Sequence, residues 1–319
     1  MGWKRSSIQR RFFSNLILVI FSISVSSSEL EKYLNSNQKT FEDIALKIWN
    51  YAELGYLENK SSQALSDELE KNGFTITKSL AGIPTSFKAE YNNGGPIIGI
   101  MGEYDALPGL SQTASPFKEV ALNETNGGHA CGHHLFGAAS AWAAVVIKEW
   151  MVKNNIEGTI RFYGTPAEEG GSGKVYLVRE GLFKDVDIVL HWHPDDTNSA
   201  NSRTSNSNKS GKFTFKGISA HAAGAPEQGR SALDGVEAMN HMVNMMREHV
   251  PQESRIHYVI TKGGLAPNVV PDLAEVYYYV RHPKMDTVDE LFKRVVKIAE
   301  GAAYGTETNM SYEVMHGNF

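Results

Sequence analysis

Apolar segments of strand length alternate with helical segments between residues 96 and 192, and this alternation is the strongest constraint on the fold. The expected strands are 96–102 (PIIGIMG), 158–164 (GTIRFYG) and 186–192 (VDIVLHW), and the expected helices are 133–151 and 172–183. Strands and helices in alternation are typical of a mainly parallel sheet with helices on both faces. Two amphipathic helices precede this region.

The pattern changes after a polar connector. Residues 195–210 (DDTNSANSRTSNSNKS) lack apolar periodicity, as linkers do. Beyond them the expected order of elements is βαββαβ, which is typical of a ferredoxin-like unit with one antiparallel sheet and two helices on one face. We therefore expect an α/β protein with a parallel-sheet domain over residues 29–208 and a ferredoxin-like domain over residues 209–319.

The first 28 residues have the order of a secretory signal, namely basic residues, an apolar run over residues 12–25 and then small residues. The apolar run is shorter than the roughly 20 residues that cross a bilayer as a helix. We therefore expect residues 1–28 to be a signal peptide that is cleaved off, and the mature chain to be secreted or periplasmic. The exact cleavage position is left open. The alternative is an uncleaved anchor, with the membrane contacted through this segment only.

The charge of the chain excludes one class of partner. The net charge is -5, and no dense run of Lys and Arg occurs beyond the N-terminus. A nucleic-acid-binding protein is therefore not expected, and a small-molecule or peptide substrate is favoured.

Polar residues follow the expected strands of the first domain, at the edge where parallel sheets bind ligands. Acids, imidazoles and a thiol come from four segments: Glu103 and Asp105, Cys131 and His133, Glu168 and Glu169, and His191 and His193. Such a donor set predicts a metal site, in which imidazole and thiolate favour zinc and carboxylates admit manganese.

Each of these residues also has an ordinary structural explanation. Cys131, the only cysteine, fits a small core position, and the pair Glu168 and Glu169 fits the start of a helix. Asp105 fits a turn before a proline. These explanations are independent of one another and do not account for the shared sheet edge, so we favour the metal site. Two adjacent carboxylates can then divide their tasks, because one can hold metal while the other transfers a proton.

The sequence resembles a family of di-metal amidohydrolases and peptidases that includes aminoacylases, carboxypeptidases and succinyl-diaminopimelate desuccinylases. It is most similar to the branch of p-aminobenzoyl-glutamate hydrolase and its dipeptidase relatives. The motifs that carry the resemblance are IWNYAELGYLENKSS, GEYDALPG, GHACGHHLFGAA, GTPAEEGGSGK, HWHP, SAHAAGAPEQGRSALD and GGLAPNVVPDLAEVYYYVRHP. The resemblance implies a metallopeptidase or amidohydrolase that cleaves an amide bond between an acyl or aminoacyl group and an amino acid. A p-aminobenzoyl-glutamate-like conjugate or a dipeptide is the implied substrate.

The resemblance also implies a role for individual residues around two divalent ions, zinc or manganese. The matched metal ligands are Cys131, His133, Glu169 and His193, the matched general acid/base is Glu168, and the matched orienting aspartate is Asp105. Glu103 stands where other branches have a metal-binding histidine, so its role is open. His134 departs from the expected Asn or Asp, and His129 is expected to shape the turn with it.

The second domain resembles the lid and dimerisation domain of the family. His221 matches a histidine that stabilises the oxyanion in the active site of the other protomer. Asn268 and Arg281 match substrate-contacting positions, and an arginine can bind a terminal carboxylate through two hydrogen bonds. A strand salt bridge is the alternative for Arg281. The resemblance thus implies a homodimer formed through this domain.

One departure from the family bears on activity. In the family the catalytic domain resumes after the lid and supplies a final metal-ligating histidine, whereas this sequence ends at Phe319. We therefore expect either a fragment of a longer protein or a shortened form with an incomplete metal centre. His316 is not expected to replace the missing ligand, because it lies too close to the last strand of the lid. A truncated relative that dimerises or binds peptides without catalysis is the alternative function. A periplasmic solute-binding protein is a further class, but it needs neither the paired glutamates nor the thiolate.

Overall fold

The computed structural model describes residues 30–121, 125–200 and 205–318. The predicted secretory signal, residues 1–28, lies outside them. The chain divides between Asn198 and Ser199 into two compact units, and each is described by itself.

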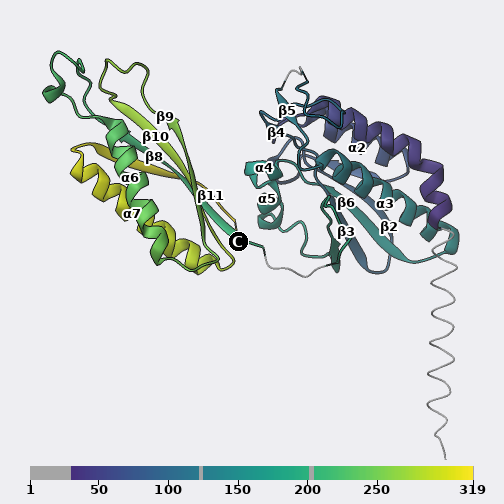
Figure 1. Cartoon of the computed structure of the whole chain (residues 1–319). Helices are drawn as coiled ribbons and strands as arrows, with labels where there is room; N and C mark the ends of the chain where they lie inside the picture. The colour runs from purple at the N-terminus through teal and green to yellow at the C-terminus, as the bar shows by residue number, and fades with distance from the viewer. Residues whose placement is uncertain (1–29, 122–124, 201–204, 319) are drawn as a thin grey trace, which may run out of the picture. The chain divides into compact units, whose positions relative to one another are not determined.

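The first unit contains a five-stranded mixed sheet in the order β1-β2-β6-β3-β7 (Figure 1). Its strands are β1 (Thr75–Lys78), β2 (Phe87–Asn93), β3 (Ile97–Gly102), β6 (Gly158–Gly164) and β7 (Ile188–Leu190). The strands β6, β3 and β7 run parallel, as the alternation of elements predicted, whereas β1 and β2 add two antiparallel pairings. The predicted α/β fold is therefore confirmed, with an antiparallel extension that the sequence did not reveal. A separate two-stranded ribbon is formed by β4 (Leu107–Pro108) and β5 (Gly127–Gly128).

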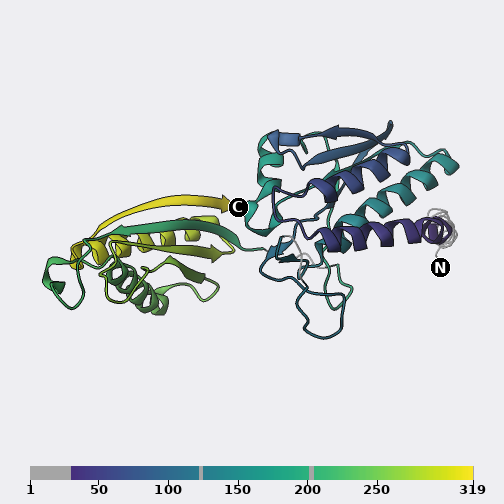
Figure 2. The same ribbon diagram turned by 90° about the horizontal axis from the view of Figure 1, so that it is seen from above.

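Helices cover both faces of this sheet because successive side chains of a strand point to opposite faces. On β6, Phe162 faces a core formed with a helix through residues 30–51, α2 (Asn59–Lys71) and α3 (His133–Asn154). These three helices lie on one side of the sheet in Figure 2. The next residue, Tyr163, packs in a smaller core with Leu177 of α5 (Gly173–Arg179).

Helix α3 is the one described helix long and apolar enough to cross a membrane. Half of its most apolar 18-residue window is buried inside the protein, and the helix packs on β3 and β6. This burial is typical of the central helix of a folded core.

The strand β7 forms one edge of the sheet. Its residues Ile188, Val189 and Leu190 are 54%, 40% and 53% exposed. Within the described parts of the chain, β3 is its only strand partner. This edge therefore presents unpaired backbone groups beside apolar side chains on both faces.

The second unit has the predicted βαββαβ order. Its elements are β8 (Ser207–Lys216), α6 (Ala232–Met246), β9 (Arg255–Lys262), β10 (Leu273–His282), α7 (Met285–Gly305) and β11 (Asn309–Asn318). The antiparallel sheet has the order β11-β8-β10-β9, and α6 and α7 lie side by side on one face (Figure 1). The central strand β8 lies between β11 and β10 and begins at Ser207, before the apolar run KFTF of residues 212–215. Its polar residues Ser207 and Ser210 are buried.

Candidate active site

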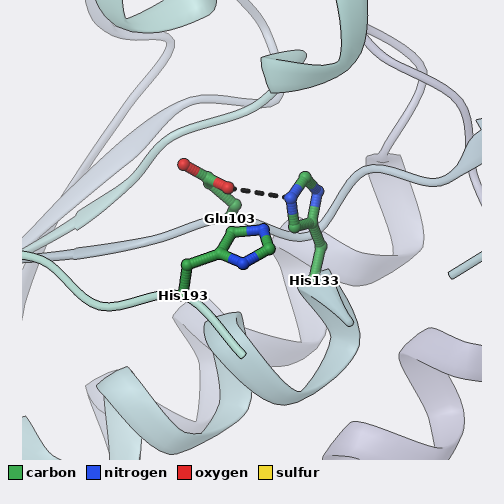
Figure 3. A group of neighbouring side chains, drawn as sticks. All are labelled: Glu103, His133 and His193. Atoms are coloured by element: carbon green, nitrogen blue, oxygen red, sulfur yellow. Dashed lines mark ion pairs between the residues drawn. The ribbon is translucent and has the colours of Figure 1, made fainter. Parts of the chain in front are cut away.

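Four segments of the first unit bring potential metal ligands together. Glu103 follows β3, His133 begins α3, Glu168 and Glu169 lie in the short helix α4 (Glu168–Gly171), and His193 follows β7. The ligand atoms form two groups, Glu103–His133–His193 and His133–Glu168–Glu169, and within each group all atoms lie within 4.8 Å of one another. Figure 3 shows the first group, in which the Glu103 carboxylate faces the His133 ring and His193 lies beside them. His133 belongs to both groups and is therefore the centre of the site.

Two buried carboxylates hold the His133 ring, which is only 1% exposed. Its Nδ1 lies 3.0 Å from Oδ1 of Asp105, and its Nε2 lies 2.9 Å from Oε2 of Glu103. Burial alone would lower the pKa of His133, but the neighbouring carboxylates of Asp105 and Glu103 raise it to about 10 in the metal-free protein. Asp105 thus fixes the orientation of the ring through Nδ1, and Nε2 is the nitrogen that could bind a metal ion.

Glu103, whose role the sequence left open, lies inside the site. Its carboxylate also contacts Nζ of Lys174, and it lies 3.4 Å from Nε2 of His191. Burial opposes its ionisation, yet His133, His191 and Lys174 hold its pKa well below the usual range. The spacing to Asp105 was the available signal, because residues two apart in an extended segment point to the same side. Lys174 was missed altogether.

The turn after β6 is irregular, and this allows two adjacent glutamates to point in different directions. Ala167 and Gly170 have positive φ angles of 55° and 80°, so α4 is a kinked turn. The backbone N–H of Glu169 donates to Oδ2 of Asp105 at 2.8 Å, while Oε1 of Glu169 is buried. Glu168 has a side chain 44% exposed, and burial together with the charge of Glu103 raises its pKa.

Cys131 is not in either group of converging atoms, but it lies next to one of them. Its thiol contacts the carboxylate of Glu169. Burial first, and then this carboxylate, raise the pKa of Cys131 to about 12. In the metal-free protein it is therefore a thiol, and a bound cation would be needed to hold it as a thiolate.

His129 and His134 pack behind the site. Nε2 of His129 lies 3.0 Å from the carbonyl oxygen of Ile48, and the His134 ring packs edge-on against Trp49 at 4.8 Å between centroids. Burial lowers the pKa of both histidines to about 4, so both are neutral. His129 thus joins the turn before α3 to the first helix, and His134 joins the first turn of α3 to the same helix.

The remaining predicted site residues lie in the second unit. His221 is bridged to Val269, and the N–H of Ala222 donates to the carbonyl of Asn268 at 3.1 Å, so His221 and Asn268 belong to adjoining loops. Arg281 lies on β10, where its guanidinium is 5.1 Å from the centroid of the Tyr279 ring. All three predicted residues are exposed.

The first-unit site has the chemistry of a cation site. Within the described residues, Oε1 of Glu169 is buried without a hydrogen bond. Oε2 of Glu103 and Nε2 of His133 are also buried, and their only close polar partner is each other, at 2.9 Å. A buried polar atom without a partner costs about 1–3 kcal/mol. A cation bound at this site would give Oε1 of Glu169 a partner, and a mixed set of carboxylate, imidazole and thiol ligands suits divalent ions.

Comparison with known sequences supports this description. Residues 204–307 match the peptidase dimerisation domain of the M20 type. The chain is 44% identical over 283 residues to a p-aminobenzoyl-glutamate hydrolase chain of Escherichia coli, a match that covers 88% of this chain and 59% of that protein. It is 29% identical to the Xaa-Arg dipeptidase of Homo sapiens, over 80% of this chain and 58% of that protein. The chain thus spans less than two thirds of the length of these relatives.

Solved structures show the same fold. An aminobenzoyl-glutamate utilization protein from Klebsiella pneumoniae superposes with a TM-score of 0.64 at 19% identity, covering 90% of this chain and 78% of that one. A dinuclear metal-binding M20 peptidase from Bacillus subtilis superposes with a TM-score of 0.58 at 21% identity, covering 88% and 74%. The predicted resemblance is confirmed: the chain is similar in sequence to a p-aminobenzoyl-glutamate hydrolase, residues 204–307 match the M20 peptidase dimerisation domain, and the fold is shared with a solved M20 peptidase.

Proposed function

We propose that the protein is a metal-dependent amidohydrolase that cleaves the amide bond between an acyl or aminoacyl group and an amino acid. The observation that carries the proposal is the convergence of Glu103, His133, Glu169 and His193 at one end of the sheet, with Glu168 beside them. Relatives named p-aminobenzoyl-glutamate hydrolase, Xaa-Arg dipeptidase and hippurate hydrolase support this class of substrate. A p-aminobenzoyl-glutamate-like conjugate and a dipeptide are the two candidates.

Two divalent ions, zinc or manganese, fit the site. The residues that would hold them are Cys131, His133, Glu169 and His193, joined by Glu103. When bound, such ions supply Lewis acidity toward the amide carbonyl and the attacking water. His193 is suited to this role because its Nδ1 donates to the carbonyl of Pro194 at 2.9 Å, which leaves Nε2 as an acceptor.

Glu168 is suited to move the proton. Burial raises its pKa, and its side chain is still 44% exposed, so the carboxyl group can exchange a proton at the site. It accepts a proton from the attacking water and passes it to the leaving amine. Asp105 keeps the geometry, because one of its oxygens holds Nδ1 of His133 and the other holds the N–H of Glu169.

We place substrate recognition in the second unit, with a homodimer formed through residues 204–307. Nδ1 of His221 accepts the backbone N–H groups of Ala223 and Gly224 at 3.2 and 3.0 Å. The ring proton therefore resides on Nε2, which is the donor that oxyanion stabilisation in the other protomer requires. Asn268 and the exposed Arg281 would contact the substrate, with the guanidinium on its carboxylate. We further propose that the mature protein is secreted or periplasmic.

The test is the Glu168→Gln variant. We expect its kcat for the hydrolysis of conjugates or dipeptides to fall roughly 100- to 10,000-fold, because proton transfer is lost. Bound metal, measured by elemental analysis, should stay unchanged, because Glu168 is not among the proposed ligands. Wild-type turnover in the variant would contradict the proposal, and a wild-type protein without bound metal would favour the non-catalytic, dimerising or peptide-binding alternative.

A further inference from the structure

Glu58 is a buried carboxylate that the proposed mechanism does not use. It is 0% exposed and precedes the first residue of α2. Oγ1 of Thr85 donates to its Oε2 at 2.8 Å, and the backbone N–H of Ala167 donates to its Oε1 at 2.8 Å. Glu58 thus joins the start of α2 to a turn that lies 109 residues later in the sequence.

Its partner in this turn is the residue directly before the two glutamates of the site. Ala167 has a φ angle of 55°, a left-handed conformation that residues with a Cβ atom rarely adopt. The N–H of the residue after Glu168, which is Glu169, donates to Asp105. The backbone N–H groups on both sides of Glu168 are therefore held by buried carboxylates, one from Glu58 and one from Asp105.

Other residues of the Glu58 segment lie against the same turn. A Cβ atom on Gly55 would come within 3.1 Å of Cα and Cβ of Ala167, so a larger residue there would push on the turn. The hydroxyl of Tyr56 donates to the carbonyl of Gly171, at the other end of α4. Residues 55–58 therefore hold the turn through two hydrogen bonds, from Tyr56 and to Glu58, and approach it closely at Gly55.

We propose that Glu58 is a positioning residue that fixes the turn carrying Glu168 and Glu169. The hydrogen bond from the N–H of Ala167 to Oε1 of Glu58 is buried, and leaving such a donor without its acceptor would cost about 1–3 kcal/mol, so this bond can hold Ala167 in its disfavoured conformation. The direction of both glutamate side chains depends on that conformation. The roles of Glu168 and Glu169 rest on the proposed function, whereas the clamp on the turn does not.

The same segment offers a matched control. Glu53 is also a buried carboxylate, but it accepts the N–H groups of Lys60 and Ser61 and the hydroxyl of Ser61, at 2.9, 2.9 and 2.8 Å. These partners belong to the first turn of α2 and not to the turn of the site. Glu53→Ala therefore removes a comparable carboxylate without touching Ala167.

The first experiment measures amide hydrogen exchange in the metal-free protein, over residues 165–173. We expect Glu58→Ala to accelerate exchange at Ala167 roughly 10-fold or more, and Glu53→Ala to accelerate it only at the start of α2. Glu58→Gln should behave like the wild type, because its amide oxygen can accept from Ala167 and its amide nitrogen can donate to Thr85. Unchanged exchange at Ala167 in Glu58→Ala would overturn the proposal.

The second experiment titrates Zn²⁺ into each folded variant by calorimetry. We expect Glu58→Ala to bind at least one ion roughly 10- to 100-fold more weakly, as other supports of ligand residues do, and Glu53→Ala and Glu58→Gln to bind like the wild type. Equal losses in Glu58→Ala and Glu53→Ala would show a general structural effect and overturn the positioning role. A wild-type protein that binds no Zn²⁺ contradicts the proposed function, while the exchange experiment still decides the clamp. If Glu58→Ala does not fold, Thr85→Val removes one of the two donors to Glu58 and should show the same changes to a smaller extent.

Discussion

The interiors of the two units differ in what they bury. The first unit encloses ionisable side chains at one end of its sheet, and they are Glu53, Glu58, Glu103, Asp105, His129 and His133. The described part of the second unit buries no carboxylate, and its core is an apolar layer between the sheet and α6 and α7. Buried charge disfavours folding unless it is paired, and the carboxylates of the first unit are held by hydrogen bonds or ion pairs, as Glu53 and Glu58 are. The second unit, by contrast, is built for stability.

The largest effect expected from this difference is that of an apolar truncation in the second unit. Phe215 is fully buried and packs against Gly235 of α6. Phe215→Ala should lower the free energy of unfolding of the second unit by about 3–5 kcal/mol, because it removes apolar contacts and leaves a cavity. Denaturant titration measures this loss. Zn²⁺ affinity of the folded variant should be unchanged, and a weakened affinity would break the division between the two units.

A pH-dependent effect of similar size is expected in the first unit. Burial, opposed by the hydrogen bonds of Thr85 and Ala167 and assisted by the charge of Asp105, raises the pKa of Glu58 from 4.5 to about 7. A raised carboxyl pKa contributes stability that is present below pH 4.5 and is lost as the pH rises through 7. The contribution is about 3 kcal/mol.

The measurement compares the free energy of unfolding of the wild type with that of Glu58→Gln from pH 4 to pH 8. The wild type should lose stability relative to the variant as the pH rises, because the variant cannot ionise at this position. Parallel pH profiles of the two proteins would contradict the assignment.

A smaller effect is expected from the polar pair inside the second unit. The hydroxyl of Tyr278 donates to Oδ1 of Asn240, and both side chains are buried. Tyr278→Phe keeps the ring but leaves Asn240 without this donor, so thermal or denaturant unfolding should show a loss of about 1–3 kcal/mol. Tyr312→Phe, at a position 48% exposed, is the control and should have little effect. Equal losses in both variants would mean that burial is not the cause.

The smallest effect is expected at the surface of the second unit. Nζ of Lys209 lies 2.7 Å from Oδ1 of Asp289, and the two side chains are 26% and 39% exposed. Asp289→Asn should change the free energy of unfolding by less than about 1 kcal/mol, because water screens such pairs. A larger loss on denaturant titration would show that charge pairing supports this unit after all.

The sequence predicted the elements with strong periodicity and the edge where polar residues meet. Strands β3 and β6, helix α3 and the whole order of the second unit follow from apolar spacing, which burial enforces. Strand β1 escaped prediction because its four residues TITK are mostly exposed and carry no apolar pattern. The sequence placed Glu103 at this edge but left its role open, because its partner His133 lies far away in the sequence. Glu58 escaped for the same reason, since no local pattern reports its contact with Ala167.

The outer side of β7 has a consequence for how the protein behaves in solution. Among the described residues, β7 pairs with β3 alone, and a strand edge with Ile188, Val189 and Leu190 beside it is a template onto which the backbone of another chain or segment can add as a further strand. Self-association at high concentration is expected to begin at this edge, because backbone pairing and apolar burial would reinforce each other there. Whatever molecule or segment occupies that edge therefore also governs solubility.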